Sequence, residues 1–270
     1  MSDGFGLAWL PLTSALLIPS TFLITYVWSV LEDHVEPDFP YISSTGAFPP
    51  ESCFFAQMLN IVALLLGVTV WVRHKQIEDH CSKTVTIGRV PGQSRVAAWL
   101  GYSAAAGISM VANFQSINII TVHMVGASLA FGVGTVYLWI QGVLSWSLVP
   151  YQNSVGVAVL RLVMAGIATA MICTTITLSI LHSQSTSYIA YWSVLREWRR
   201  ERTSWRLHIS ATVAEWVLAG AFVVFLFTLI PEFKRITVAT VRVETERDRR
   251  QVKQRDDSRV SSTDTVQDIR

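Results

Sequence analysis

The sequence contains six stretches of mostly apolar residues, and each is long enough to cross a membrane. A transmembrane helix needs about 20 such residues, because the hydrocarbon core of a bilayer is roughly 30 Å thick. Buried helices of a large soluble protein would need a polar outer face, and 15% charged residues supply too little for one. The sequence therefore predicts an all-α fold, a multi-pass membrane protein with a six-helix transmembrane bundle over 1–233. The predicted spans are 7–30, 53–72, 96–114, 117–144, 155–181 and 207–230.

The distribution of Lys and Arg predicts the orientation of these spans. The loop at 31–52 has neither residue, the loop at 73–95 has five, and the segment after Phe233 has ten. Cytoplasmic loops carry the excess of Lys and Arg, so both termini are expected in the cytoplasm. The segment 194–208 disagrees, since its five arginines would lie on the outer side. The charged segment 234–270 is expected to be a partly disordered cytoplasmic tail.

A short loop of unusual composition, FPYISSTGAFPPES at 39–52, separates the first two spans. Its prolines disfavour helix, and Thr45-Gly46 permits a left-handed backbone. Glu51 follows Pro50 at the expected start of the second helix, where the helix dipole favours an acid. Two interpretations stay open: a structured cap on the bundle, or a surface that recognises a partner.

Polar side chains inside the apolar spans form a first candidate site. An ionisable residue within a membrane is costly unless it is paired or hydrated, so it suggests a function, whereas amides often join helices. A structural role is the alternative for each of them. These residues are expected in the outer half of the bundle: Asn60, Asn113, His123, His208 and Glu215.

Glu215 is expected to need a partner, and His123 and His208 are the titratable candidates. A carboxylate–histidine pair changes its charge near neutral pH, so the pair is expected to be pH-sensitive. Arg161 and Gln141 form a second candidate site toward the cytoplasmic side. The alternative for Arg161 is a side chain that extends to the membrane surface.

The sequence contains no motif of soluble catalysis, neither a Gly-rich phosphate loop nor a nucleophile elbow. The histidines and Glu215 lack the close spacing of zinc motifs, so no metal and no cofactor are expected. A net charge of +2 gives no reason to expect a nucleic-acid partner.

Several segments in order resemble the damage-regulated autophagy modulator family. They are HVEPDFPYISSTGAFPPES at 34–52, FFAQMLNI and VRHKQ in and after the second span, MVANFQ at 110–115, His123, Arg161, an H-x6-EW pattern at 208–216, and EFKRIT at 232–237. Ser44 stands where an Asp is typical of the family. The resemblance implies that the outer loop is a signature of the family. Its signature residues are Pro40, Tyr41, Ile42, Ser43, Thr45, Gly46, Pro50 and Glu51.

This resemblance implies a non-enzymatic, six-span protein of lysosomal or other endomembranes that promotes autophagy. Its expected partners are membrane lipids or proteins of the autophagy and lysosomal machinery. The alternative is a lipid-handling membrane protein, a remodelling enzyme or scramblase, that uses His123, His208 and Glu215. The sequence does not predict the oligomeric state.

Overall fold

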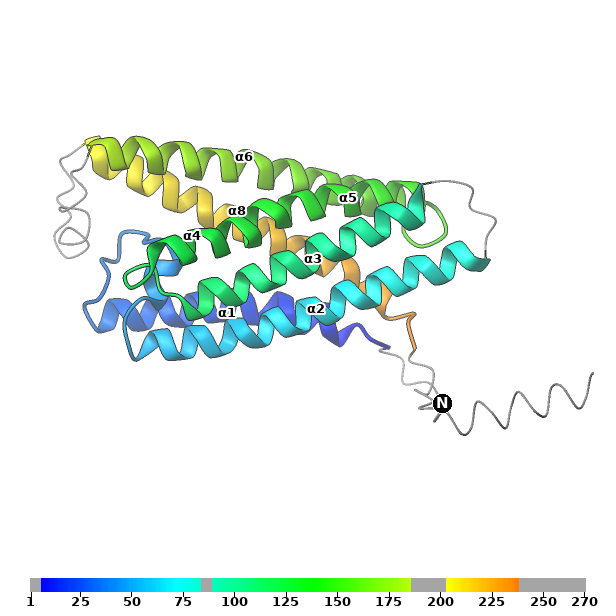
Figure 1. Cartoon of the computed structure of the whole chain (residues 1–270), viewed down its shortest axis with the longest axis horizontal. Helices are drawn as coiled ribbons and strands as arrows, with labels where there is room; N and C mark the ends of the chain where they lie inside the picture. The colour runs from blue at the N-terminus through cyan, green and yellow to red at the C-terminus, as the bar shows by residue number, and fades with distance from the viewer. Residues whose placement is uncertain (1–5, 84–88, 186–202, 238–270) are drawn as a thin grey trace, which may run out of the picture. The chain divides into compact units, whose positions relative to one another are not determined.

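The computed structural model describes residues 6–83, 89–185 and 203–237, and within these ranges the chain is helical without strands. The all-α prediction is therefore confirmed (Figure 1). The elements are α1 (Trp9–Leu31), η1 (Ile42–Gly46), α2 (Glu51–Lys83), α3 (Val90–Asn113), α4 (Ile120–Ala127), η2 (Ser128–Val133), α5 (Gly134–Ser147), α6 (Val155–Ser185) and α8 (Thr203–Phe233).

The described chain makes six long helical passes, because α4, the π-helical turn η2 and α5 form one continuous pass. Five of the six are long and apolar enough to cross a membrane. The exception is α3, whose Arg95 and many Gly, Ala and Ser residues lower its hydropathy. Small residues are common where membrane helices pack closely, so a lower hydropathy is compatible with a place inside the bundle.

The second helix is longer than the sequence predicts. The apolar stretch ends at Val72, whereas α2 continues through polar residues to Lys83, and α3 already begins at Val90. The predicted loop at 73–95 is thus mostly helical, which corrects the prediction. A helix that continues into water needs no apolar residues, since its inner backbone groups bond within the helix and the carbonyls of its last turn can bond to water.

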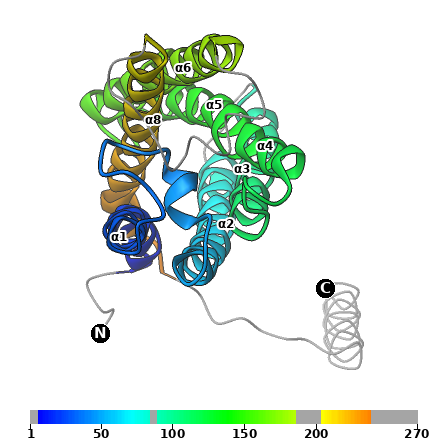
Figure 2. The same ribbon diagram turned by 90° about the vertical axis from the view of Figure 1, so that its left-hand side faces the viewer.

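The passes form a closed ring, seen along the helices in Figure 2. Contacts join α1 to α2, α2 to α3, α3 to the pass of α4, η2 and α5, α5 to α6, α6 to α8, and α8 back to α1. The short helix η1 contacts α1, α2 and α8 at one end of the ring. We call this end of the ring the loop end.

The other end holds the first and last described residues. The backbone N–H of Leu7 donates a hydrogen bond to the carbonyl of Phe233, with N and O 3.0 Å apart. The start of α1 and the end of α8 therefore meet, as an even number of passes requires. We call this the terminus end. The arginine-rich segment falls mostly outside the described residues, as does nearly all of the predicted tail.

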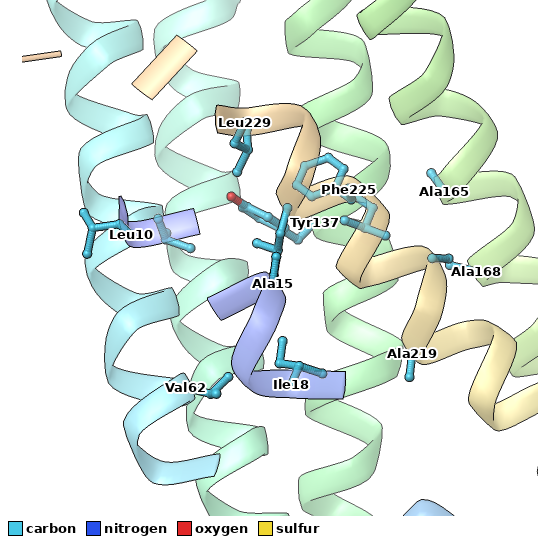
Figure 3. Close-up of a cluster of buried hydrophobic side chains, with 14 of the residues drawn as sticks. Leu10, Ala15, Ile18, Val62, Tyr137, Ala165, Ala168, Ala219, Phe225 and Leu229 are labelled. Carbon is cyan, nitrogen blue, oxygen red and sulfur yellow. The ribbon is translucent and has the colours of Figure 1, made fainter. Parts of the chain in front are cut away.

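Two kinds of packing hold the ring together. Aromatic and aliphatic side chains pack on its inner face, and Figure 3 shows Tyr137 of α5 near Phe225 and Leu229 of α8. Between α3 and α4 the backbones themselves approach: a Cβ on Gly107 would lie 2.6 Å from the carbonyl oxygen of Gly126. Only glycine permits this approach, which is how small residues bring membrane helices together.

Candidate functional site

A cavity of about 140 Å³ lies inside the ring. Side chains from α1, η1, α2, α3, α4, η2, α5 and α8 line it, whereas α6 contributes none of the lining residues. Most of the lining is apolar, with Phe22, Leu59, Phe131 and Phe222 among the larger side chains. The interior of the bundle is therefore a hydrophobic chamber behind the loop-end cap.

Glu215 and His123 are the titratable side chains of the first candidate site that line this chamber. Glu215 is half-buried, and its Oε2 accepts a hydrogen bond of 2.9 Å from the backbone N–H of Ile42. His123 is buried, and its Nδ1 lies 2.8 Å from the carbonyl oxygen of Phe114. Since a carbonyl only accepts, Nδ1 carries the proton and Nε2 is the acceptor of the neutral ring.

The prediction that His123 or His208 pairs with Glu215 is wrong. Among the described residues Glu215 makes no ion pair with a histidine, and its partner is the backbone of η1. The sequence pattern did not reveal this contact, because Ile42 supplies a main-chain group whose position depends on the fold of the loop. The carboxylate therefore tethers the loop to α8 and is not half of a pH-sensitive His–Glu pair.

The loop at 32–50 is an ordered cap, fixed by side chains from several helices. The Tyr41 hydroxyl lies 2.9 Å from Ser179 Oγ of α6, and the Trp216 indole of α8 donates to the carbonyl of Pro40 at 3.0 Å. Thr45 Oγ1 lies 2.9 Å from Thr25 Oγ1 of α1. The signature residues of the loop thus hold it down onto three helices.

Two details of the cap differ from the sequence prediction. Residues 42–46 form a short 3₁₀ helix despite the neighbouring prolines. The backbone φ is positive at Asp33 and Phe39, and Gly46 is not among the residues with positive φ. Gly46 is needed for space instead, because a Cβ there would lie 2.4 Å from Cγ of Phe55.

Glu51 opens α2, as its position after Pro50 predicts. Its side chain is fully buried, and Oε1 lies 2.5 Å from Nδ1 of His34. The contact joins the two ends of the cap. The second oxygen of Glu51 is buried without a hydrogen bond to any described residue.

A cluster of buried charges lies at the terminus end. Arg73 of α2 and Arg161 of α6 are each 0% exposed, and Glu232 of α8 is 3% exposed. Glu232 forms ion pairs with both: Oε2 with Arg73, and Oε1 with Nη2 of Arg161 at 2.6 Å. Oε1 of Glu232 has no hydrogen-bond partner among the described residues, so the second contact is an ion pair outside hydrogen-bond geometry. Nη2 of Arg161 also donates to the carbonyl of Thr228 at 2.9 Å.

Neutral side chains complete this cluster. Arg161 donates to Ser145 Oγ at 2.6 Å and to Thr228 Oγ1 at 2.9 Å. Arg73 donates to Gln141 Oε1 at 3.3 Å, so the structure brings the second candidate pair, Gln141 and Arg161, into one network. Arg161 is thus enclosed between helices and does not extend to the membrane surface.

Arg73 and Glu232 are not among the candidates that the sequence predicts, because both stand just beyond the apolar stretches. A signal exists in the sequence: Arg73 directly follows the second span and Glu232 stands two residues after the sixth, so opposite charges are expected at the same level of the bundle.

Asn60 and Asn113 form a separate contact between α2 and α3. Asn60 Nδ2 donates to Asn113 Oδ1 at 3.1 Å, Asn113 Nδ2 donates to Asn60 Oδ1 at 3.0 Å, and Ser109 Oγ donates to Asn60 Oδ1 at 2.7 Å. Neither asparagine lines the chamber. The pair joins two helices, as inter-helix amides commonly do.

His208 lies apart from the chamber. Its ring packs edge-on against Tyr41, with centroids 5.1 Å apart, beside a small cavity of about 30 Å³. The five outer-half candidates therefore occupy three places: the α2–α3 contact, the chamber and the cap.

The described chain is thus a multi-pass helical membrane protein with an ordered cap, an apolar chamber and a buried charge cluster. The chain belongs to the family described as Frag1/DRAM/Sfk1/Cwh43P N-terminal domain, which it matches over residues 6–236. The family resemblance of the sequence is thereby confirmed.

Its relatives include proteins named for autophagy. The chain is 34% identical over 237 residues to DNA damage-regulated autophagy modulator protein 2 of Rattus norvegicus, covering 86% of each chain. It is 32% identical over 241 residues to DNA damage-regulated autophagy modulator protein 1 of Homo sapiens, covering 89% of this chain and 95% of the relative. It is also 40% identical over 161 residues to the modulator of macroautophagy TMEM150B of Mus musculus, covering 58% of this chain and 63% of the relative. No solved structure shows significant similarity to the chain.

Proposed function

We propose that this protein is a non-enzymatic membrane regulator of autophagy that acts on lysosomal or other endomembranes through a lipid or protein partner. The observation that carries the proposal is the similarity to two autophagy modulators over more than four fifths of the chain. The similarity includes the whole helical bundle, so the features that position the cap and the chamber lie within it.

Several polar side chains of the described bundle hold helices or the cap in place, which supports a regulatory role. Asn60 and Asn113 join α2 to α3, Glu215 holds the cap, and Glu232 joins α2, α6 and α8. None of these contacts places a nucleophile beside a base in the way that covalent catalysis requires.

Autophagic flux tests the proposal. Cells that lack the gene should show reduced flux under starvation, and re-expression of the full chain should restore it. The matched control is a chain with Val217→Leu, a conservative change on the outward face of α8. Unchanged flux after loss of the gene would contradict the proposal.

A lipid-handling activity is the second candidate, because the chamber offers an apolar volume with an acid and a histidine at one end. Purified protein in liposomes tests it directly. Transfer of labelled phospholipid between leaflets, or its chemical conversion, would favour this second function over the first.

A further inference from the structure

We infer that the chamber is a binding site for a single-chain lipid whose head group donates hydrogen bonds, a long-chain amine or a monoacylglycerol. The inference deepens the proposed function by naming the class of lipid through which the protein acts. It stands on the size, the lining and the polarity of the chamber.

The size of the chamber fits one hydrocarbon chain. Its volume of about 140 Å³ is close to ten times the roughly 10–15 Å³ that one buried water requires. Its lining on α8 runs from Glu215 to Leu229, which at 1.5 Å per residue is a length of about 20 Å. A space so long and so small in volume is narrow, and it excludes a two-chain phospholipid or a flat ring system.

The lining of the chamber is suited to a hydrocarbon chain. Val70, Leu226 and Leu229 line the part away from the cap, Ala105 lines the middle, and Ala219 lies one helical turn from Glu215. Apolar cavities of this size do not hold water but do take up apolar molecules. Because the surrounding membrane consists of such molecules, a hydrocarbon chain is the available occupant.

The polar side chains at the cap end of the chamber, Glu215, His123 and Ser43, determine the head group, whereas Thr69 and Tyr137 line the chamber farther from the cap. Glu215 uses Oε2 to accept the Ile42 N–H, and among the described residues its other oxygen has no hydrogen-bond partner. The proton of His123 is held by the Phe114 carbonyl, so the neutral ring has an acceptor to offer. The side chains of Glu215 and His123 can therefore each accept a hydrogen bond from a head group that donates one.

An anionic head group does not fit. No Lys or Arg is among the residues that line the chamber, so a phosphate or carboxylate head would face Glu215 without a compensating cation. Like charges at short range in a low-dielectric interior repel strongly. This argument excludes fatty acids and phosphatidic acid, and it favours an amine or a hydroxyl head.

Photo-crosslinking to the purified full-length protein in phosphatidylcholine nanodiscs tests the inference. The probes are a long-chain amine, a monoacylglycerol and a fatty acid of equal chain length, each with a diazirine on the chain. We expect the amine, the monoacylglycerol or both to label peptides of α8 between Glu215 and Leu229, with at least about tenfold less labelling by the fatty acid.

Two variants and one control complete the test. Ala219→Leu, one turn from Glu215, fills the chamber and should abolish labelling by every probe, whereas Val217→Leu on the outward face should leave it unchanged. Glu215→Gln keeps the shape and should weaken labelling by the amine about tenfold, with a smaller effect on the monoacylglycerol. If Ala219→Leu does not fold, Ala105→Leu fills the same space from α3.

The result that overturns the inference is labelling by the fatty acid equal to that by the amine and the monoacylglycerol, or labelling that the filling variants do not reduce. Binding and flux are measured separately, so their failures are distinguishable. Specific binding together with unchanged flux in cells that lack the gene would refute the proposed function alone. Changed flux without specific binding would refute the inference alone.

Discussion

Glu232 is the carboxylate on which two buried arginines depend. Arg73 and Arg161 each place a guanidinium group in the cluster, and both side chains are fully enclosed. Two guanidinium groups face one carboxylate, so the cluster holds excess positive charge. Nη2 of Arg73 is also buried without a hydrogen bond to any described residue. Its stability therefore depends on a single acid.

Replacement of that acid should destabilise the protein severely. Glu232→Gln leaves two guanidinium groups without a counter-charge, and removal of one partner from a buried ion pair costs about 3–5 kcal/mol. Thermal unfolding in detergent, followed by tryptophan fluorescence, measures the loss. The control is Glu78→Gln, which breaks an exposed pair with Lys75 and should leave the melting temperature unchanged. Equal melting temperatures for both variants would contradict the structural role of the cluster.

Glu215 allows a finer experiment, since its charge and its hydrogen bond can be removed separately. Glu215→Gln retains an oxygen that accepts the Ile42 N–H, so the cap should stay in place. Glu215→Leu leaves that N–H without its partner, which costs about 1–3 kcal/mol. We expect faster proteolysis within 32–50 for Glu215→Leu alone. Equal proteolysis of both variants would show that the contact does not hold the cap.

The helices show which features a linear sequence predicts and which it does not. Apolar stretches of about 20 residues predict the six passes, because each helix must individually match the thickness of the bilayer. The end of α2 at Lys83 could not be predicted, since the length of a polar helix outside the membrane is not limited by the thickness of the bilayer. The chamber was missed as well: His123 and Glu215 are 92 positions apart in the sequence, and only the closure of the ring brings their helices around one space.

The contact between α3 and α4 is sensitive to one methyl group. A Cβ on Gly107 would lie 2.6 Å from the backbone nitrogen of Ala130, and backbone cannot move aside as a flexible side chain can. Gly107→Ala should therefore cost about 1–3 kcal/mol of stability, the usual range for overpacking. The measurement is the melting temperature of the purified protein.

Gly166 supplies the matched control on α6. A Cβ there has no described atom within 4 Å, so Gly166→Ala should be neutral or slightly stabilising through its higher helix propensity. A fall in melting temperature for Gly166→Ala equal to that for Gly107→Ala would mean that the effect does not come from the α3–α4 approach.

The ring as a whole places the cap and the chain ends on opposite sides of the bundle. The Lys and Arg count that predicts the orientation needs one correction, because Arg73 is buried and is not a loop charge. The difference between the two ends remains. The cap still has no Lys or Arg, whereas the terminus end keeps several: Lys75, Lys83, Arg89, Arg95, Lys234 and Arg235. The proposed orientation remains a cytoplasmic terminus end.

Cysteine accessibility tests this arrangement in a chain with Cys53, Cys81 and Cys173 replaced by Ser. Glu36→Cys places a thiol on the exposed cap, and Gly92→Cys places one at the start of α3, where a Cβ meets nothing within 4 Å. In cells with only the plasma membrane permeabilised, a membrane-impermeant maleimide should label Gly92→Cys at once. It should label Glu36→Cys only after detergent opens the organelles, because the cap then faces the lumen. The reverse pattern would invert the orientation, and simultaneous labelling of both would refute a bundle whose two ends are separated by a bilayer.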